Sequence, residues 1–257
     1  MQEWIAWLAL PPADVLAWLA AAAFAAGLAR GFSGFGTALI FVPIAAMVIG
    51  PTRAVPLMVV LDVLPILAMT PGAWHLADRR EVGWLALGAA VGMPVGLAML
   101  VTIDALSLRW MICLLILALL GVVASGWRFR GQPSVPATVG VGIASGTMAG
   151  IAMIPGPPVM VYLLGQGAPA PRIRAVFMVF LAASNVLAAT AFGLAGLLGA
   201  WLPGPVLATL PSYLLGTWAG AALFGLASEE TFRRATYAMI ALAAVIALPL
   251  LDGWLRG

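Results

Sequence analysis

Two glycine- and proline-rich interruptions contain the residues whose types and spacing could bind a small anion. The first is the run Gly31-Phe32-Ser33-Gly34-Phe35-Gly36, and the second is centred on Gly150 and Pro155-Gly156-Pro157-Pro158. Glycine interrupts helices through backbone entropy, and proline does so by removing an N–H donor and clashing with the preceding turn. A helix that restarts after such a break directs unsatisfied N–H groups and a partial positive charge toward whatever precedes it, which makes an anion site.

Side chains beside the breaks could add a fixed charge and further donors. Arg30 directly precedes the first break, and its planar guanidinium can bind two oxygens of an anion. Alternatively, a helix from Asp14 to Arg30, about 24 Å long, would let this side chain extend to a membrane interface. The predicted substrate-binding residues are Arg30, Ser33, Gly34, Phe35, Gly36, Thr37, Gly150, Pro155, Gly156, Pro157, Tyr162 and Asn185.

The glycines in this set have two interpretations. They could let a small ligand approach the backbone, or they could let two helices touch, as small residues four apart commonly do in membranes. For the breaks we favour the ligand, because close packing needs no interruption of the helix. For the run Gly88-x3-Gly92-x3-Gly96 we favour helix packing.

Asp62 is the candidate for ion coupling. It lies midway along an apolar stretch, between Pro56 and Pro65. A carboxylate there is costly unless it is paired or protonated, so Asp62 could carry a coupled proton. The alternative is a structural partner for an arginine or for a carbonyl freed by the prolines. Asn185 lies in the matching stretch of the second half and could line the same cavity.

Composition determines the class of protein that holds these residues. Hydrophobic residues make up 64% of the 257 residues and charged residues only 8%, whereas soluble domains carry about 25% charged residues. The net charge of +3 comes with no basic cluster, so nucleic acid is not an expected partner. One histidine and one cysteine leave little for a metal, cofactor or enzyme active site. Long apolar runs predict an all-helical integral membrane protein.

The arginines suggest how the chain crosses the bilayer. Six segments are long enough to span it: 54–70, 82–101, 109–124, 174–195, 205–226 and 234–251. Regions 13–50 and 137–165, which contain the breaks, could each be one broken span or a re-entrant hairpin, and the arginines favour hairpins. With two hairpins, eight arginines share one face against three on the other, whereas single spans divide them six to five. Cytoplasmic loops are enriched in arginine, so the eight mark the cytoplasm: Arg79, Arg80, Arg128, Arg130, Arg172, Arg174, Arg233 and Arg234.

This topology predicts that both termini are periplasmic, although two tight full crossings per region would give the same sides. It also predicts a duplication. An interfacial segment, 1–12, precedes repeat 1 (13–126), and a cytoplasmic linker, 127–136, precedes repeat 2 (137–251). Each repeat is one hairpin plus three spans, an odd number, so the repeats are inverted relative to each other. Gly27-x3-Gly31 is matched by Gly142-x3-Gly146, and Arg53-Ala54-Val55 by Arg174-Ala175-Val176.

Paired broken helices in inverted repeats are typical of secondary transporters, which bind substrate between the repeats near mid-membrane. A passive anion channel would share the same paired half-helices. Only Asp62 argues for coupling, and with it for a transporter.

The motifs resemble a known family. The run from Arg30 to Gly36, followed by Pro43 and Arg53-Ala54-Val55, resembles the first repeat of the TauE/SafE sulfite exporter family. The run from Pro155 to Leu164, followed by Arg174-Ala175, resembles its second repeat. The resemblance covers about residues 13–251. Many members have a fuller glycine run where Gly34-Phe35-Gly36 stands here, which bears on the substrate more than on the fold.

The resemblance implies a bacterial inner-membrane carrier of small sulfur-containing anions such as sulfite and organosulfonates. The family is also called the 4-toluene sulfonate uptake permease group, so the direction of transport differs among members. We therefore expect a secondary exporter without a cofactor, embedded in the lipid bilayer and coupled to protons. An anion channel, or an uptake permease for another oxyanion or a carboxylate, is the alternative. The oligomeric state stays open, with a homodimer among the alternatives.

Overall fold

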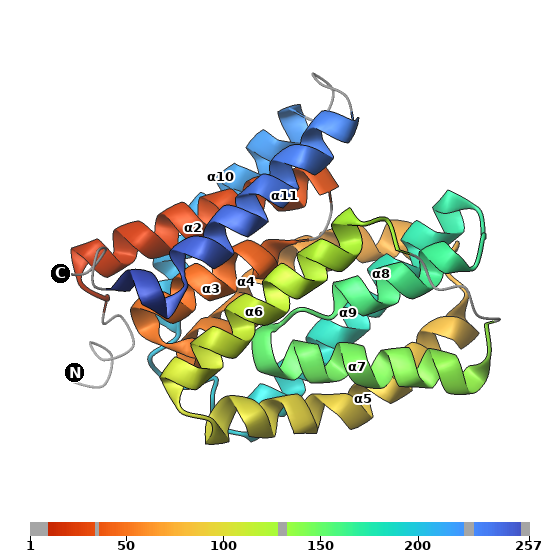
Figure 1. The fold of residues 1–257 in the computed structure, drawn as a ribbon, viewed down its shortest axis with the longest axis horizontal. Coiled ribbons are helices and arrows are strands. Elements are labelled where there is room, and N and C mark those ends of the chain that lie inside the picture. The colour runs from red at the N-terminus through yellow and green to blue at the C-terminus, as the bar shows by residue number, and fades with distance from the viewer. Residues whose placement is uncertain (1–9, 34–35, 128–132, 224–228, 253–257) are drawn as a thin grey trace. The chain divides into compact units, whose positions relative to one another are not determined.

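A computed structural model describes residues 10–33, 36–127, 133–223 and 229–252. These residues are helical wherever they are regular, and no strand occurs among them. In chain order (Figure 1) the helices are α2 (Ala13–Ser33), α3 (Thr37–Ile49), α4 (Pro51–Trp74), α5 (Arg79–Thr102), α6 (Ala105–Ala124), α7 (Val135–Ala152), α8 (Gly156–Gly165), α9 (Ala170–Leu194), α10 (Pro203–Leu223), α11 (Glu229–Ile246) and the 3-10 turn η1 (Pro249–Leu251).

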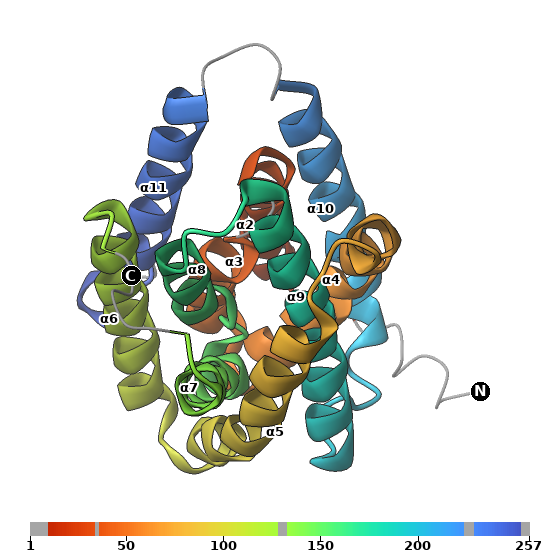
Figure 2. The same cartoon turned by 90° about the vertical axis from the view of Figure 1, so that its right-hand side faces the viewer.

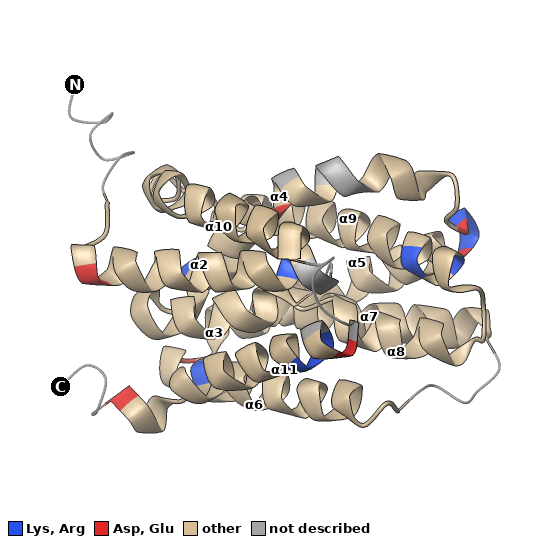
Figure 3. Ribbon diagram, turned by 90° about the horizontal axis from the view of Figure 1, so that it is seen from above, with Lys and Arg blue, Asp and Glu red and all other residues tan. Residues whose placement is uncertain are grey.

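Six of the described helices are long and apolar enough to cross a membrane: α2, α5, α6, α7, α9 and α10. The prediction of an all-helical, multi-pass membrane protein is therefore confirmed. Most of the length of each helix carries no charged residue (Figure 3), as a hydrocarbon environment requires. The predicted spans 54–70 and 234–251 lie on α4 and on α11 with η1, which are outside this set of six.

The first arms of the two predicted hairpins are longer than the sequence suggested. Helix α2 has 21 residues and α7 has 18, or about 32 and 27 Å at 1.5 Å per residue. The expectation that 137–149 is a short piece is wrong, because Ser134 caps a helix that continues to Ala152. The second arms, α3 with 13 residues and α8 with 10, are short. Each interrupted region is thus one helix of spanning length followed by a short helix.

The chain divides into two compact units, and each unit takes helices from both halves of the sequence. Unit 1 comprises Met1–Leu61, Ile103–Leu120 and Gly196–Gly257, and unit 2 comprises Asp62–Thr102 and Gly121–Ala195. Unit 1 therefore contains the first break, between α2 and α3, and unit 2 contains the second, between α7 and α8. In unit 1, α2 contacts α3, α10 and α11, and in unit 2, α7 contacts α5, α8 and α9.

Glycines hold one long helix pair together in each unit. In unit 1, α2 meets α10 so closely that a Cβ at Gly31 would lie 2.4 Å from the Thr217 carbonyl oxygen, and a Cβ at Gly216 would lie 2.2 Å from the Phe24 oxygen. In unit 2, α5 lies beside α7 (Figures 1 and 2). There a Cβ at Gly92 would lie 2.1 Å from the Ile143 oxygen. The helix-packing interpretation of Gly88, Gly92 and Gly96 is confirmed.

The helix ends around the two breaks have one common spacing. The ends of α2 and α7, the starts of α3 and α8, and the starts of α4 and α9 are each 119 residues apart (33 to 152, 37 to 156 and 51 to 170). This spacing aligns Gly27 with Gly146 and Gly31 with Gly150. The sequence motifs alone had suggested a register shifted by four residues for these glycines. For these glycines, the motif pairing and the helix boundaries therefore give different alignments.

Candidate functional site

The first break, in unit 1, is a left-handed turn that starts a buried helix. Gly36 is the N-cap of α3 and has φ 92°, a conformation in which other residues are strained. As a glycine, this N-cap has no side chain to cap the helix start. Thr37, the first residue of α3, is only 4% exposed, and α3 is buried as far as Met47. A buried helix start needs an acceptor for its N–H groups, so this one is suited to an anion.

Arg30 lies in the last turn of α2, in the same unit, and is only 3% exposed. Its alternative role, extending to the membrane interface, requires a guanidinium at the surface of the protein, whereas this one is enclosed. The C-terminal end of a helix favours a cation, which helps α2 to hold the charge. Arg30 therefore keeps a buried positive charge in the unit that contains the first break.

Sequence reasoning missed Thr236 on α11. Its methyl carbon lies 3.8 Å, and the Ile240 side chain 3.6 Å, from where a Cβ of Gly36 would be. Thr236 is 1% exposed, and its hydroxyl has no hydrogen-bond partner among the described residues. A buried hydroxyl without a partner costs stability, so one beside the helix break is a candidate ligand contact. Nothing in the sequence separates Thr236 from other threonines on apolar helices.

The second break, in unit 2, has a different local chemistry. The C-cap of α7 is Met153, a non-glycine residue with φ 55°, and the N-cap of α8 is Pro155. The Ser145 hydroxyl donates a hydrogen bond to the Pro155 carbonyl and ties α7 to the break. Gly156 has the Phe177 ring beside it, 3.2 Å from where its Cβ would be.

The start of α8 is poor in donors. Pro155, Pro157 and Pro158 have no N–H, so Gly156 supplies the one N–H of the N-cap and first three helical positions. The partial positive charge of the helix end remains, but the hydrogen-bond donors are mostly absent. The sequence prediction treated the two breaks as equivalent anion sites. In donor capacity they are unequal, with α3 the better.

Gly150 has a different neighbour from the one the sequence suggested. A Cβ at Gly150 would lie 2.6 Å from both the Met93 carbonyl oxygen and the Leu97 nitrogen of α5. That side of its backbone is occupied by a helix, so helix packing explains this glycine. The same holds for Gly31 and Gly146, which face α10 and α5.

Tyr162 lies deeper along α8, six residues after Gly156, which is about 9 Å along the helix axis. It is 1% exposed, and its hydroxyl is 2.6 Å from the Thr138 hydroxyl of α7. Because Thr138 donates its one proton to the Ser134 carbonyl, Tyr162 is the donor in this pair. Tyr162 therefore joins α8 to the start of α7 rather than lining the start of α8.

Asp62 and Asn185 are both buried, at 7% and 3% exposure, on α4 and α9. Both belong to unit 2. Next to Asn185, the Ser184 hydroxyl is fully buried without a hydrogen-bond partner among the described residues, which is a second polar group that the sequence prediction missed. A desolvated amide and hydroxyl on neighbouring positions give α9 a local polar spot in an apolar helix.

The predicted site residues thus fall into two groups. Unit 1 holds Arg30, Gly36 and Thr37, and unit 2 holds the others that are described: Asp62, Gly150, Pro155, Gly156, Pro157, Tyr162 and Asn185. The Ser33 side chain, Gly34 and Phe35 lie outside the described residues. Within the described ranges, no three His, Cys, Asp or Glu side chains come together to hold a metal ion.

These features define a multi-pass helical membrane protein with one broken, glycine-packed helix in each of two units. The sequence matches the family model described as Sulfite exporter TauE/SafE over residues 19–247. The chain therefore belongs to this family of membrane transporters. Searches of curated proteins and of solved structures gave no match.

Proposed function

We propose that this protein is a secondary transporter that exports a small sulfur-containing anion, sulfite or an organosulfonate, across the bacterial inner membrane. The observation that carries the proposal is the start of α3: buried, turned by Gly36 and without a side-chain cap. Its N–H groups need an acceptor, and an anionic oxygen is a strong one. Membership of the family is the independent support.

In this proposal the first break is the main anion site. The N–H groups of Thr37 and Ala38, the Arg30 guanidinium and the Thr236 hydroxyl supply donors from three elements, α2, α3 and α11. The second break, in unit 2, would offer mainly the partial positive charge of α8 and the Gly156 N–H. It would therefore bind an anion more weakly than the first break does, which suits a carrier that must also release its substrate.

Two inverted repeats would provide alternating access. The proposal is supported by the common spacing of 119 residues around the breaks and by the pairing of the long helices. The first helix of each predicted repeat, α2 or α7, packs through glycines on the fourth helix of the other, α10 or α5. Equivalent contacts in both units are what an internal duplication produces.

Asp62 would carry the coupled proton, because a charged carboxylate in an apolar helix interior is costly. The arginine distribution of the sequence supports both termini on the periplasmic side and the eight-arginine face in the cytoplasm. Export would then move the anion away from that face.

The test is sulfite and organosulfonate flux into proteoliposomes. Arg30→Gln is expected to lower kcat/KM at least tenfold, because a hydrogen bond to a charged group contributes about 1.5–3 kcal/mol. Arg53→Gln is the matched control: Arg53 is in the same unit and stacks on the Trp201 ring, 5.7 Å from its centroid, away from the break residues. If Arg30→Gln, folded as judged by its thermal unfolding, transports like the Arg53 variant, the site assignment is wrong.

The rival function is an anion channel, favoured by the same half-helices. A channel conducts without saturation and follows the voltage, whereas a carrier saturates. An imposed pH gradient should drive sulfite flux by the parent protein and not by Asp62→Asn. Flux that is linear in sulfite concentration and indifferent to the pH gradient would replace the carrier by the channel.

A further inference from the structure

A separate cavity of about 490 Å³ lies in unit 2, where the starts of α5, α7 and α9 and the end of α8 come together. We propose that it is a vestibule that binds a small oxyanion before the anion reaches the second break. This inference rests on the proposed anion transport and adds a second binding site to it. The cavity is lined by Asp78, Arg80, Glu81, Trp84, Pro133, Ser134, Val135, Thr138, Tyr162, Gln166, Ala168 and Arg172.

Helix starts give the vestibule a positive bias. Asp78 precedes α5, Ser134 caps α7, and Pro169 is the N-cap of α9. Each helix start carries a partial positive charge. Three helix starts against one helix end, that of α8, together with the guanidinium groups of Arg80 and Arg172, favour a negatively charged occupant.

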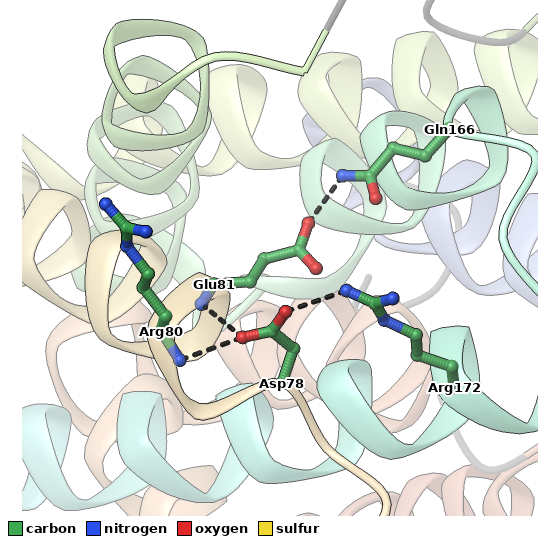
Figure 4. A network of polar contacts seen from close by, with 5 residues as sticks. All are labelled: Asp78, Arg80, Glu81, Gln166 and Arg172. Atoms are coloured by element: carbon green, nitrogen blue, oxygen red, sulfur yellow. Dashed lines mark hydrogen bonds and ion pairs between the residues drawn. The ribbon is translucent and has the colours of Figure 1, made fainter.

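The two carboxylates of the vestibule already have donors (Figure 4). Asp78 accepts hydrogen bonds from the backbone N–H groups of Glu81 and Arg80, at 3.2 and 3.0 Å, and from the Arg172 guanidinium at 2.7 Å. These contacts, the Glu81 N–H first, hold the pKa of Asp78 below its ordinary value. Glu81 accepts a hydrogen bond from the Gln166 amide. Each carboxylate of the vestibule therefore already has at least one hydrogen-bond donor.

The polar groups left over are donors. The Arg80 guanidinium makes no ion pair or side-chain hydrogen bond with another described residue, and it points away from the Asp78 carboxylate in Figure 4. The Trp84 indole N–H is buried without an acceptor among the described residues. Buried indole N–H groups usually find a partner. A cavity lined by the Arg80 guanidinium and by an indole N–H without an acceptor suits a ligand with several acceptor oxygens, such as an oxyanion.

Arg172 can exchange its present partner, Asp78, for another anion. Its side chain is 52% exposed and that of Asp78 is 35% exposed, and exposed pairs contribute about 0–1 kcal/mol. An incoming anion can therefore share or replace the carboxylate on Arg172 at little cost. Asp78 stays in place because two backbone N–H groups hold it.

The vestibule leads toward the second break. Thr138 and Tyr162 line it, and Tyr162 is about 9 Å along α8 from Gly156. The volume is in the range of small-molecule sites, about 300–1,000 Å³, and much larger than one water, about 30 Å³. It therefore admits a hydrated inorganic anion or a sulfonate with an organic group.

The single cysteine makes the vestibule testable by labelling. Cys113 is buried, so Ala168→Cys in a Cys113→Ala background places one reactive thiol in the cavity. A neutral methanethiosulfonate labels it, and sulfate at constant ionic strength is the competing probe, because sulfite would cleave the product disulfide. We expect saturable protection by sulfate. Arg80→Gln and Arg172→Gln should each raise the half-protecting concentration about tenfold, the loss of one charge-assisted hydrogen bond.

Arg79→Gln is the matched control. Arg79 is adjacent in sequence, carries the same charge and stacks over the Trp74 ring, 5.5 Å from its centroid, outside the cavity lining. Its variant should be protected like the parent. Equal loss of protection in Arg79→Gln and Arg80→Gln, or no saturable protection in the parent, would overturn the vestibule.

Lipid phosphate offers the same oxygens as a free anion, so the labelling is repeated in nanodiscs of zwitterionic lipid and of phosphatidylglycerol. Protection by phosphatidylglycerol without sulfate would assign the cavity to a headgroup and overturn the vestibule. Sulfate protection in the zwitterionic discs supports it. These readouts do not depend on flux, so transport lost through Arg30→Gln with protection intact separates the vestibule from the main site.

Discussion

Thr236→Val should stabilise the protein and at the same time weaken its hold on substrate. The hydroxyl of Thr236 is buried without a partner among the described residues, and the methyl carbon of the same side chain lies beside Gly36. Valine keeps the branched shape and removes the hydroxyl. An unsatisfied buried polar group costs about 1–3 kcal/mol, so we expect the free energy of unfolding to rise by about 1 kcal/mol, at the low end because the extra methyl must be accommodated.

The loss in binding follows from the same hydroxyl. If it donates to the anion, its removal forfeits a hydrogen bond to a charged group, about 1.5–3 kcal/mol. That corresponds to a roughly ten- to hundredfold increase in the Kd for sulfite. Stability is measured by denaturant unfolding in detergent, and binding by the sulfite concentration dependence of flux in proteoliposomes.

Thr209→Val is the matched control for this prediction. Thr209 is equally buried in the same unit, but its hydroxyl donates to the Pro205 carbonyl at 2.7 Å. Its removal should lower stability by about 0.5–1.5 kcal/mol and leave sulfite affinity unchanged. If Thr236→Val is destabilised to the same degree and transports normally, the Thr236 hydroxyl has a structural partner and our reading of the first break is refuted.

Three further outcomes test the packing and the polar ties. Gly92→Ala should destabilise unit 2 by about 1–3 kcal/mol, because the new Cβ would lie 2.1 Å from a carbonyl oxygen of α7. The control Gly83→Ala has open space around it and should gain about 0.5–1 kcal/mol of stability from helix propensity. Equal shifts in thermal unfolding for the two variants would contradict this prediction. Asp252→Asn should lower the free energy of unfolding by about 1–3 kcal/mol, since it leaves the buried Arg109 without the carboxylate 2.7 Å away. If denaturant unfolding is the same as for the parent, the ion pair contributes nothing to stability. Asp78→Ala should cost about 0.5–2 kcal/mol at neutral pH as a lost helix cap. The folded-state pKa of Asp78 lies below its ordinary value. The stability difference between the parent and Asp78→Ala is therefore fully present above about pH 4 and shrinks as the pH falls below it. A difference that stays constant from pH 7 to pH 3 would contradict this prediction.

The position of the helix breaks was readable from the sequence, but the lengths of their arms were not. Glycine and proline mark an interruption because their backbone constraints are local. Whether α7 continues to Ala152 depends on its glycines meeting α5, and a sequence window contains no information about that neighbour. For the same reason the sequence suggested that Gly150 faces a ligand, although it packs against α5.

By itself the sequence determined the membrane class, the two breaks and the family, because hydropathy and short motifs depend on residue type and order. The tertiary structure decided which groups are desolvated together. It buried Arg30 and brought Thr236 to Gly36. A residue's chemistry is fixed by its type, but its partners are set by helices far away in the chain, which is why Thr236 and the vestibule were visible only in three dimensions.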